Sequence, residues 1–297
     1  MDKPTDDKPT DEQAERRASI KRLSRDLLKA AVTMSAMEAR FLVDAYYLMQ
    51  EDRKRAHNQV RAMKEEPHEV IAWLAEQSEI LEGQIKRALD AYSQSLPVGQ
   101  WMQGIFGIGP VIAAGMLAHI DINRAPTAGH IWRFAGLDPT LKWEKGKKRP
   151  FNGELRTLCW KAGQSFMKFS NNDDCVYGHV YRSRKDYEVK RNESGGNKDR
   201  AAEILTEKKF DKSTEAYKAL ITGKLPPAQI DARARRYAVK LFLSHLQCVW
   251  WFVEHEKLPR DPYAIGIKGH AHFIPVPNAE AVEGLAQALR GKGWSHG

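Results

Sequence analysis

The stretch GIFGIGPVIAAGML, Gly104–Leu117, joins a glycine-rich turn to the start of an apolar helix. Glycine reaches positive φ without the penalty of a Cβ atom, so we expect Gly107 and Gly109 to form a tight turn. Pro110 suits the first turn of a helix, where its missing N–H costs no hydrogen bond. The small residues that follow would let this helix pack closely on a neighbour. The stretch therefore predicts two short helices joined by a tight turn.

The predicted turn leaves backbone N–H groups exposed at a helix N-terminus, which is a favourable position for a phosphate. This arrangement resembles the helix-hairpin-helix motif, which grips the sugar–phosphate backbone without reading bases. We therefore take Gly107, Ile108 and Gly109 as candidate phosphate contacts. A purely structural turn between packed helices would use the same residues, so this segment alone leaves both interpretations open.

A strongly basic segment follows the turn. Within 142–149 there are five cationic residues and one acidic residue, and Trp143 lies among them. The helix expected over 153–169 adds two cations on either side of Trp160. Cations interleaved with aromatic rings are typical of a groove that follows a nucleic-acid strand, although a run of charge is often only a solvated face. The candidate nucleic-acid contacts in this region are Lys142, Lys145, Lys147, Lys148, Arg149, Arg156 and Lys161.

Several motifs occur in a recognisable order between Gly104 and Lys168. The glycine turn is followed by RFAGLDP at Arg133–Pro139, then by the basic loop, then by a helix that bears an arginine. In this order the motifs resemble the C-terminal domain of the DEDD-type insertion-sequence transposases of the 110/116/902 group. The resemblance implies contact with DNA or a guide RNA, and a role in DNA transposition and recombination.

Two departures from that family concern catalysis. The family carries a RuvC-like nuclease domain with four acidic metal ligands, but the residues before Gly104 read as helices and offer no such quartet. The family's serine nucleophile is expected in the loop after Gly-Leu-x-Pro, but no serine occurs between Asp138 and Gln164. The sequence therefore assigns no catalytic residue, metal or cofactor, and it leaves open whether the chain is an enzyme.

Three functions remain in view from the sequence. The leading interpretation is a transposase-like protein that binds DNA or guide RNA and lacks its own strand-cleavage chemistry. The second is an active transposase or recombinase with a displaced hydroxyl nucleophile at Thr140, Thr157 or Ser165. The third is a protein-interaction scaffold whose functional surface is an N-terminal helical hairpin.

Apolar periodicity predicts a mostly α fold. Residues 1–17 repeat the motif DKPT and are expected to form a disordered tail. Apolar residues at three- and four-residue steps predict a long helical hairpin, or coiled coil, over 18–96. Ser35 and Glu38 have the spacing of a capping box, so one helix is expected to end and another to begin there.

The remaining chain is expected to form two further parts. The helix-hairpin-helix-like nucleic-acid-binding domain would span 97–191, and a C-terminal helical region would span 192–297. The latter includes a long helix over 228–257 and an irregular tail. The segment NESGGNKDR, 192–200, reads as an exposed flexible loop.

The charge of the chain indicates its partners. Lys and Arg number 47 against 38 Asp and Glu, which gives a formal net charge of +9 and favours polyanions. No apolar run is long enough to span a bilayer, and no secretory signal is visible. We therefore expect a cytoplasmic protein that binds nucleic acid and no membrane, and that self-associates through the hairpin. The cysteines Cys159, Cys175 and Cys248 are expected to be reduced packing residues.

Two further groups of residues invite a functional interpretation. Arg233, Arg236 and Lys240 share a face of the long helix and could follow a phosphate backbone, but we interpret them as a solvated face. His270 and His272 form a His-x-His pair that could face a metal ion. No third ligand is evident from spacing, so no metal site is predicted.

Overall fold

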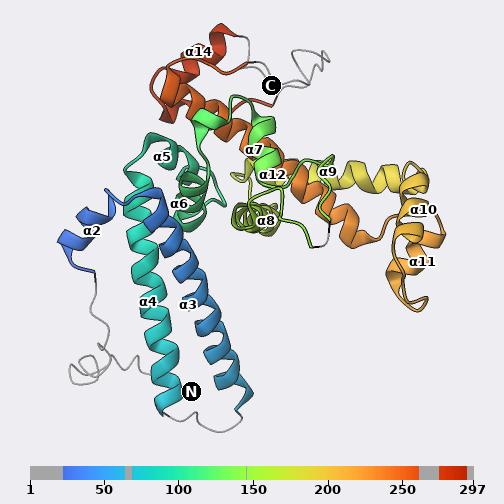
Figure 1. The fold of residues 1–297 in the computed structure, drawn as a ribbon, viewed down its shortest axis with the longest axis horizontal. Coiled ribbons are helices and arrows are strands. Elements are labelled where there is room, and N and C mark those ends of the chain that lie inside the picture. The colour runs from blue at the N-terminus through green and yellow to red at the C-terminus, as the bar shows by residue number, and fades with distance from the viewer. Residues whose placement is uncertain (1–22, 64–68, 145, 261–273, 293–297) are drawn as a thin grey trace, which may run out of the picture. The chain divides into compact units, whose positions relative to one another are not determined.

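The computed structural model describes residues 23–63, 69–144, 146–260 and 274–292. Every regular element over these ranges is a helix (Figure 1), which confirms the predicted mostly α fold. The contacts between residues divide the chain into two compact units, 1–96 and 97–297. In the described ranges no helix is both long and apolar enough to cross a bilayer. The predicted tail and the His-x-His pair lie outside the described residues.

Two long helices, α3 (Ala36–Ala62) and α4 (Glu69–Gln94), lie antiparallel and side by side in the first unit (Figure 1). The predicted capping box begins α3, because the Ser35 hydroxyl accepts from the Glu38 amide at 3.3 Å and the Glu38 carboxylate accepts from the Ser35 amide at 2.7 Å. The short α2 (Arg25–Ala31) packs on α4. The capping box thus starts a new helix within an otherwise continuous apolar pattern.

A buried carboxylate joins the two long helices. Glu82 of α4 accepts from Arg53 Nε at 2.5 Å and from Gln50 Nε2 at 3.4 Å, both on α3. Burial alone would raise the pKa of Glu82, but hydrogen bonds from Arg53, Tyr46 and Gln50 outweigh burial and lower it. The charged carboxylate therefore fixes the register of α3 against α4.

The second unit is organised around one long helix, α12 (Pro227–His255), which occupies the place of the helix expected over 228–257. Within the described residues it packs against the short η1 (Ile122–Arg124) and against four α-helices. The four α-helices are α5 (Pro97–Gln103), α7 (Ala128–Phe134), α8 (Gly153–Lys168) and α9 (Val176–Glu193).

Four buried aromatic rings form the centre of this unit. Trp101 comes from α5, Phe166 from α8, Tyr177 from α9 and Phe242 from α12. The ring centroids lie 5.0 Å apart for Phe166 and Tyr177, and 5.4 Å apart for Tyr177 and Phe242. Tilted and edge-on contacts of this kind add to the free energy gained from burial. This cluster fixes α8, α9 and α12 relative to one another.

A smaller apolar cluster lies under α10 (Lys198–Glu207) and α11 (Glu215–Ile221), which pack on each other. Its buried members include Ile204, Leu220 and Ile230. The segment 192–200, which leads into α10, is not simply the exposed loop that its composition predicts. Asn197 is buried there and donates to Asn192 Oδ1 at 3.0 Å, so this turn is part of the packed structure.

The C-terminal segment of the described chain contains η2 (Ala279–Ala281) and α14 (Leu285–Gly291). It is held to the unit by polar contacts as well as by apolar packing. Trp101 Nε1 donates to the Pro277 carbonyl at 2.8 Å, and Asn278 Nδ2 donates to the Gly104 carbonyl at 2.7 Å. The segment therefore braces α5 and the chain that follows it.

A buried histidine connects α12 with α9 and with this C-terminal segment. His245 is 4% exposed, its Nδ1 lies 2.8 Å from the Tyr177 hydroxyl, and its Nε2 lies 3.0 Å from the Ile274 carbonyl. A neutral ring satisfies both contacts by accepting at Nδ1 and donating from Nε2. Burial lowers the pKa of His245 from 6.5 to about 4. The ring is therefore neutral in the folded protein at physiological pH.

The free energy of unfolding should fall as the pH decreases from about 6.5 to about 4. In this interval the unfolded chain binds a proton at His245 while the folded chain does not, so the loss reaches at most about 3 kcal/mol. Urea unfolding across this pH range, compared between the wild type and His245→Gln, measures the effect. The variant should lose much of the pH dependence, and a variant that retains all of it would contradict this assignment.

Candidate nucleic-acid interface

The predicted turn connects α5 to α6 (Pro110–His119), and Pro110 begins α6 as the sequence indicates. Gly107 has a φ of +96°, and its carbonyl accepts a hydrogen bond from Ser165 Oγ of α8 at 2.6 Å. Gly109 differs from the prediction, because it caps α6 in an extended conformation with φ −96° and ψ 176°. Only Gly107 therefore requires the conformational freedom of glycine.

The residues of this turn differ in what they expose. Ile108 is buried, and its amide donates to the Ile105 carbonyl at 3.0 Å, so it anchors the turn to the core. Gly109 is exposed, and no side chain caps the first turn of α6. The amide groups at that end of the helix are therefore the part of the turn that can accept an anion.

The basic loop after the turn folds around a tryptophan. Trp143 Nε1 donates to the Lys147 carbonyl at 2.7 Å, and the Arg149 guanidinium lies 5.4 Å from the centre of the Trp143 ring. Lys147 Nζ also lies 3.4 Å from the Glu144 carboxylate. Lys145 lies outside the described residues. The other predicted contacts of this loop are all exposed to solvent, and they are Lys142, Lys147, Lys148 and Arg149.

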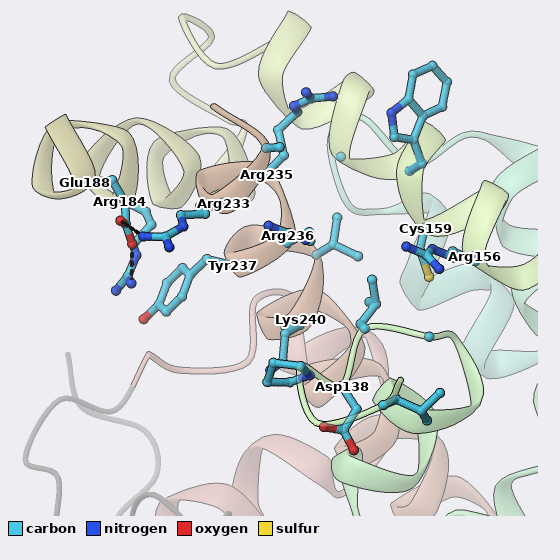
Figure 2. Close-up of a pocket in the computed structure, with 18 of the residues that line it drawn as sticks. Asp138, Arg156, Cys159, Arg184, Glu188, Arg233, Arg235, Arg236, Tyr237 and Lys240 are labelled. Carbon is cyan, nitrogen blue, oxygen red and sulfur yellow. Dashed lines mark hydrogen bonds and ion pairs between the residues drawn. The ribbon is translucent and has the colours of Figure 1, made fainter. Parts of the chain in front are cut away.

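A pocket of about 930 Å³ lies between α8, α9 and α12, beside the loop that contains Asp138 (Figure 2). Its lining is strongly basic, with two acidic side chains, Asp138 and Glu188. The cationic lining residues are Arg156, Arg184, Arg191, Arg233, Arg235, Arg236 and Lys240.

Three of these arginines are paired with carboxylates. Glu188 of α9 is 2% exposed and lies 2.6 Å from Arg184 and 3.3 Å from Arg233, as the dashed lines in Figure 2 show. Arg235 lies 2.7 Å from Asp231. A buried carboxylate is stable only when it is paired in this way. These pairs therefore belong to the structure of the pocket wall.

Three other arginines contact no carboxylate within the described ranges, namely Arg156 of α8, Arg191 of α9 and Arg236 of α12. Arg191 Nε donates to the Gly196 carbonyl at 3.3 Å, whereas Arg156 and Arg236 have no such backbone contact in the described chain. The Arg156 guanidinium lies 4.8 Å from the centre of the Phe151 ring. Burial lowers the pKa of Arg236, and the neighbouring cations Arg233, Arg156 and Arg235 lower it further. Positive charge is thus concentrated at this point of the pocket, and no carboxylate of the described residues forms an ion pair with Arg156 or Arg236.

The cations expected to form a solvated face of α12 are exposed at Arg236 and half-buried at Arg233 and Lys240. Arg233, Arg236 and Lys240 do share one face of the helix, but that face lines the pocket. Sequence reasoning also missed Arg184 and Arg191, which lie seven residues apart on one side of α9 and line the same pocket. Helical spacing signals that such residues share a face, but it does not reveal which neighbouring helix that face meets.

The nucleic-acid contacts predicted on α8 and in the glycine turn lie on different sides of this helix. Arg156 and Trp160 line the pocket, whereas Ser165 contacts the glycine turn. Nine residues separate Arg156 from Ser165, which is about two and a half helical turns, so their side chains point in opposite directions. Lys161 is partly buried and does not line the pocket. The structure therefore does not bring the turn and Arg156 together on one surface.

The hydroxyl groups considered as displaced nucleophiles all donate hydrogen bonds to nearby oxygens. Thr140 donates to Asp138 Oδ1 at 2.7 Å, Thr157 to the Gly153 carbonyl at 3.1 Å, and Ser165 to the Gly107 carbonyl. Hydrogen bonds from the Thr140 amide and hydroxyl lower the pKa of Asp138, which makes it a weaker base. None of the three hydroxyl residues lines the basic pocket.

Comparison with known proteins shows that part of this region is similar to a known family. Residues 100–173 match the family described as transposase IS116/IS110/IS902, which confirms the resemblance for that segment. The match includes the turn, the basic loop and α8, while α9 and α12 lie beyond it. No curated protein and no solved structure matches the chain.

The two glycines of the turn should respond differently to substitution. Gly107→Ala should lower the free energy of unfolding by about 1–3 kcal/mol, because its φ is positive and the added Cβ would lie 3.3 Å from Ser165 Oγ. Gly109→Ala is the matched control, because its Cβ would meet no heavy atom within 4 Å, and its stability should stay within about 1 kcal/mol of wild type. Urea unfolding of both variants measures the difference, and equal losses would contradict the conformational argument.

Proposed function

We propose that this chain is a transposase-related protein that binds nucleic acid through its second unit and does not itself cleave strands. The observation that carries the proposal is the pair Arg156 and Arg236, two cations that face one pocket without an acidic partner in the described structure. A site that gathers positive charge in this way favours a phosphate, which guanidinium groups bind with paired hydrogen bonds. The family match of residues 100–173, which include Arg156, supports the same class of ligand.

The exposed loop 142–149 would add contacts outside the pocket. Lys142, Lys147, Lys148 and Arg149 are exposed and lie in the same family-matched segment. Together with the amides near Gly109 they would bind phosphates without reading base identity. The same chemistry serves DNA and RNA, so a guide RNA is as suitable a ligand as a DNA duplex.

The absence of strand cleavage is proposed from the hydroxyl groups. The loop after Pro139 has no serine before Ser165, and Ser165 donates to the backbone on the side of α8 away from the pocket. Thr140 is held by Asp138 in a local turn. An active transposase, the alternative function, would require Thr157 or Ser165 to leave its hydrogen bond to the backbone, or Thr140 to give its proton to Asp138, whose lowered pKa makes it a weak base.

Binding to duplex DNA should weaken steeply with salt. Neutralisation of about four phosphates predicts a slope near −3.6 for the logarithm of the binding constant against the logarithm of salt concentration, because bound counterions are released. Fluorescence anisotropy of a labelled duplex over a series of NaCl concentrations measures this slope. Undetectable or salt-independent binding of both this duplex and a single strand of the same length would contradict the proposed function.

A charge-reversal variant of the loop separates nucleic-acid binding from a scaffold role. Replacing the three loop cations with glutamate should weaken duplex binding by at least about tenfold, because about three phosphate contacts are lost. A control variant with three reversed charges on exposed residues elsewhere in the second unit should have a much smaller effect. The loop variant is Lys147→Glu with Lys148→Glu and Arg149→Glu, and the control is Lys208→Glu with Lys209→Glu and Lys212→Glu.

We further infer that the helical hairpin mediates self-association. Met37, Phe41 and Leu48 lie on one side of α3 at four- and seven-residue steps, and all three are exposed. An exposed apolar stripe of this kind is typical of a surface that packs against another protein. Sedimentation velocity should show an oligomer that Phe41→Ser with Leu48→Ser shifts toward monomer, and a monomeric wild type would contradict this inference.

A further inference from the structure

We propose that the pocket between α8, α9 and α12 binds a single-stranded segment of nucleic acid, with a phosphate between Arg156 and Arg236 and a base stacked on Trp160. This inference rests on the proposed function, and it specifies which form of nucleic acid enters the pocket. The ligand class is an unpaired polynucleotide, either DNA or RNA.

The size of the pocket favours an unpaired strand. A volume of about 930 Å³ lies in the range of sites that enclose small ligands, so it accommodates a few nucleotides. In a duplex the bases are paired inside and the phosphates lie on the outer surface of a wide rod. A duplex can therefore place phosphates at the mouth of such a pocket but cannot enter it. An extended single strand can enter with both its phosphates and its bases.

The charges of the pocket favour a phosphate at one position. Arg184, Arg233 and Arg235 are already paired with buried or partly buried carboxylates, so their charges stabilise the wall of the pocket. Arg156 of α8 and Arg236 of α12 come from two different helices and line the same pocket; both are labelled in Figure 2. A phosphate between them would supply the negative charge that the described part of the protein does not provide there. Guanidinium groups approaching from two sides also orient a phosphate.

The aromatic residues of the lining are not equivalent. The Phe151 ring is covered by Arg156 and the Tyr237 ring by Arg184, at 4.8 Å and 4.7 Å respectively. Trp160 is 57% exposed, and no aromatic ring or cation of the described structure stacks on it. It lies one helical turn after Arg156 on the same side of α8. This geometry leaves the indole face available for a base, and stacking of this kind tolerates any sequence.

The test compares single strands with a duplex on the full chain. Labelled single-stranded DNA and RNA of about 20 nucleotides, and a blunt DNA duplex of the same length, are titrated by fluorescence anisotropy. The pocket variant is Arg156→Gln with Arg236→Gln. The matched control is Arg124→Gln with Arg290→Gln, which removes the same charge from exposed arginines of the same unit that do not line the pocket.

The pocket variant should weaken binding to a single strand by at least about tenfold and reduce its salt slope by about 1.4, since two phosphate contacts are lost. Its effect on duplex binding should be smaller than about threefold, and the control should change neither. Whichever single strand the wild type binds more tightly, DNA or RNA, is the type of nucleic acid that we assign to the pocket. Thermal unfolding of both variants checks that each is folded, which we expect because none of the four arginines forms an ion pair within the described residues.

Two results would overturn the inference. One is an equal loss of affinity for single strands and duplex, and the other is a loss no larger than that of the control. If the wild type binds no nucleic acid at all, the proposed function itself fails. If the wild type binds duplex with the expected salt dependence, but the pocket variant loses no more affinity for single strands than for duplex, only the assignment of the pocket fails.

Substitution of Trp160 tests the stacking part separately. Trp160→Ala should weaken single-strand binding by about fivefold or more, and Trp160→Phe should restore most of the affinity because it keeps a ring. Both variants alter an exposed side chain, so thermal stability should remain near that of the wild type. Unchanged affinity in Trp160→Ala, or no difference between the two variants, would overturn the assignment of this residue.

Discussion

Contact between three buried rings, Phe166 of α8, Tyr177 of α9 and Phe242 of α12, holds together the helices that form the basic pocket. Each helix directs apolar side chains to this cluster and basic side chains to the pocket. The cluster must be strong enough to oppose the repulsion among the cations that it gathers. The buried histidine on α12 adds a polar connection between the same helices, because it contacts the hydroxyl of Tyr177.

The carboxylates near the pocket reduce that repulsion selectively. Glu188 compensates two arginines and Asp231 compensates a third, and all of these pairs lie in the walls. Arg156 and Arg236 are left without such compensation, so the protein retains positive charge where a ligand can reach it. The segment that matches the transposase family supplies Arg156 but not Arg236. The pocket is therefore a joint product of that segment and of helices that the family match does not include.

Features that depend on a few neighbouring residues were predictable from the sequence. The capping box at Ser35, the start of α6 at Pro110 and the positive φ of Gly107 follow from local backbone rules. The expectation of a special conformation at Gly109 was wrong, because a residue that precedes a proline and caps a helix N-terminus favours the extended region. The pocket could not be predicted either, because its residues come from three helices whose mutual arrangement is decided by the aromatic core.

The position of α8 has a consequence for the path of any bound polymer. This single helix of 16 residues has the glycine turn against one side and the pocket on the other. A straight strand cannot touch both sites, because the helix stands between them as a partition. A polynucleotide that engages both must curve around the end of α8, and otherwise two separate strands occupy its two sides. The position of α8 therefore favours either one bent polynucleotide or two separate strands as the ligand.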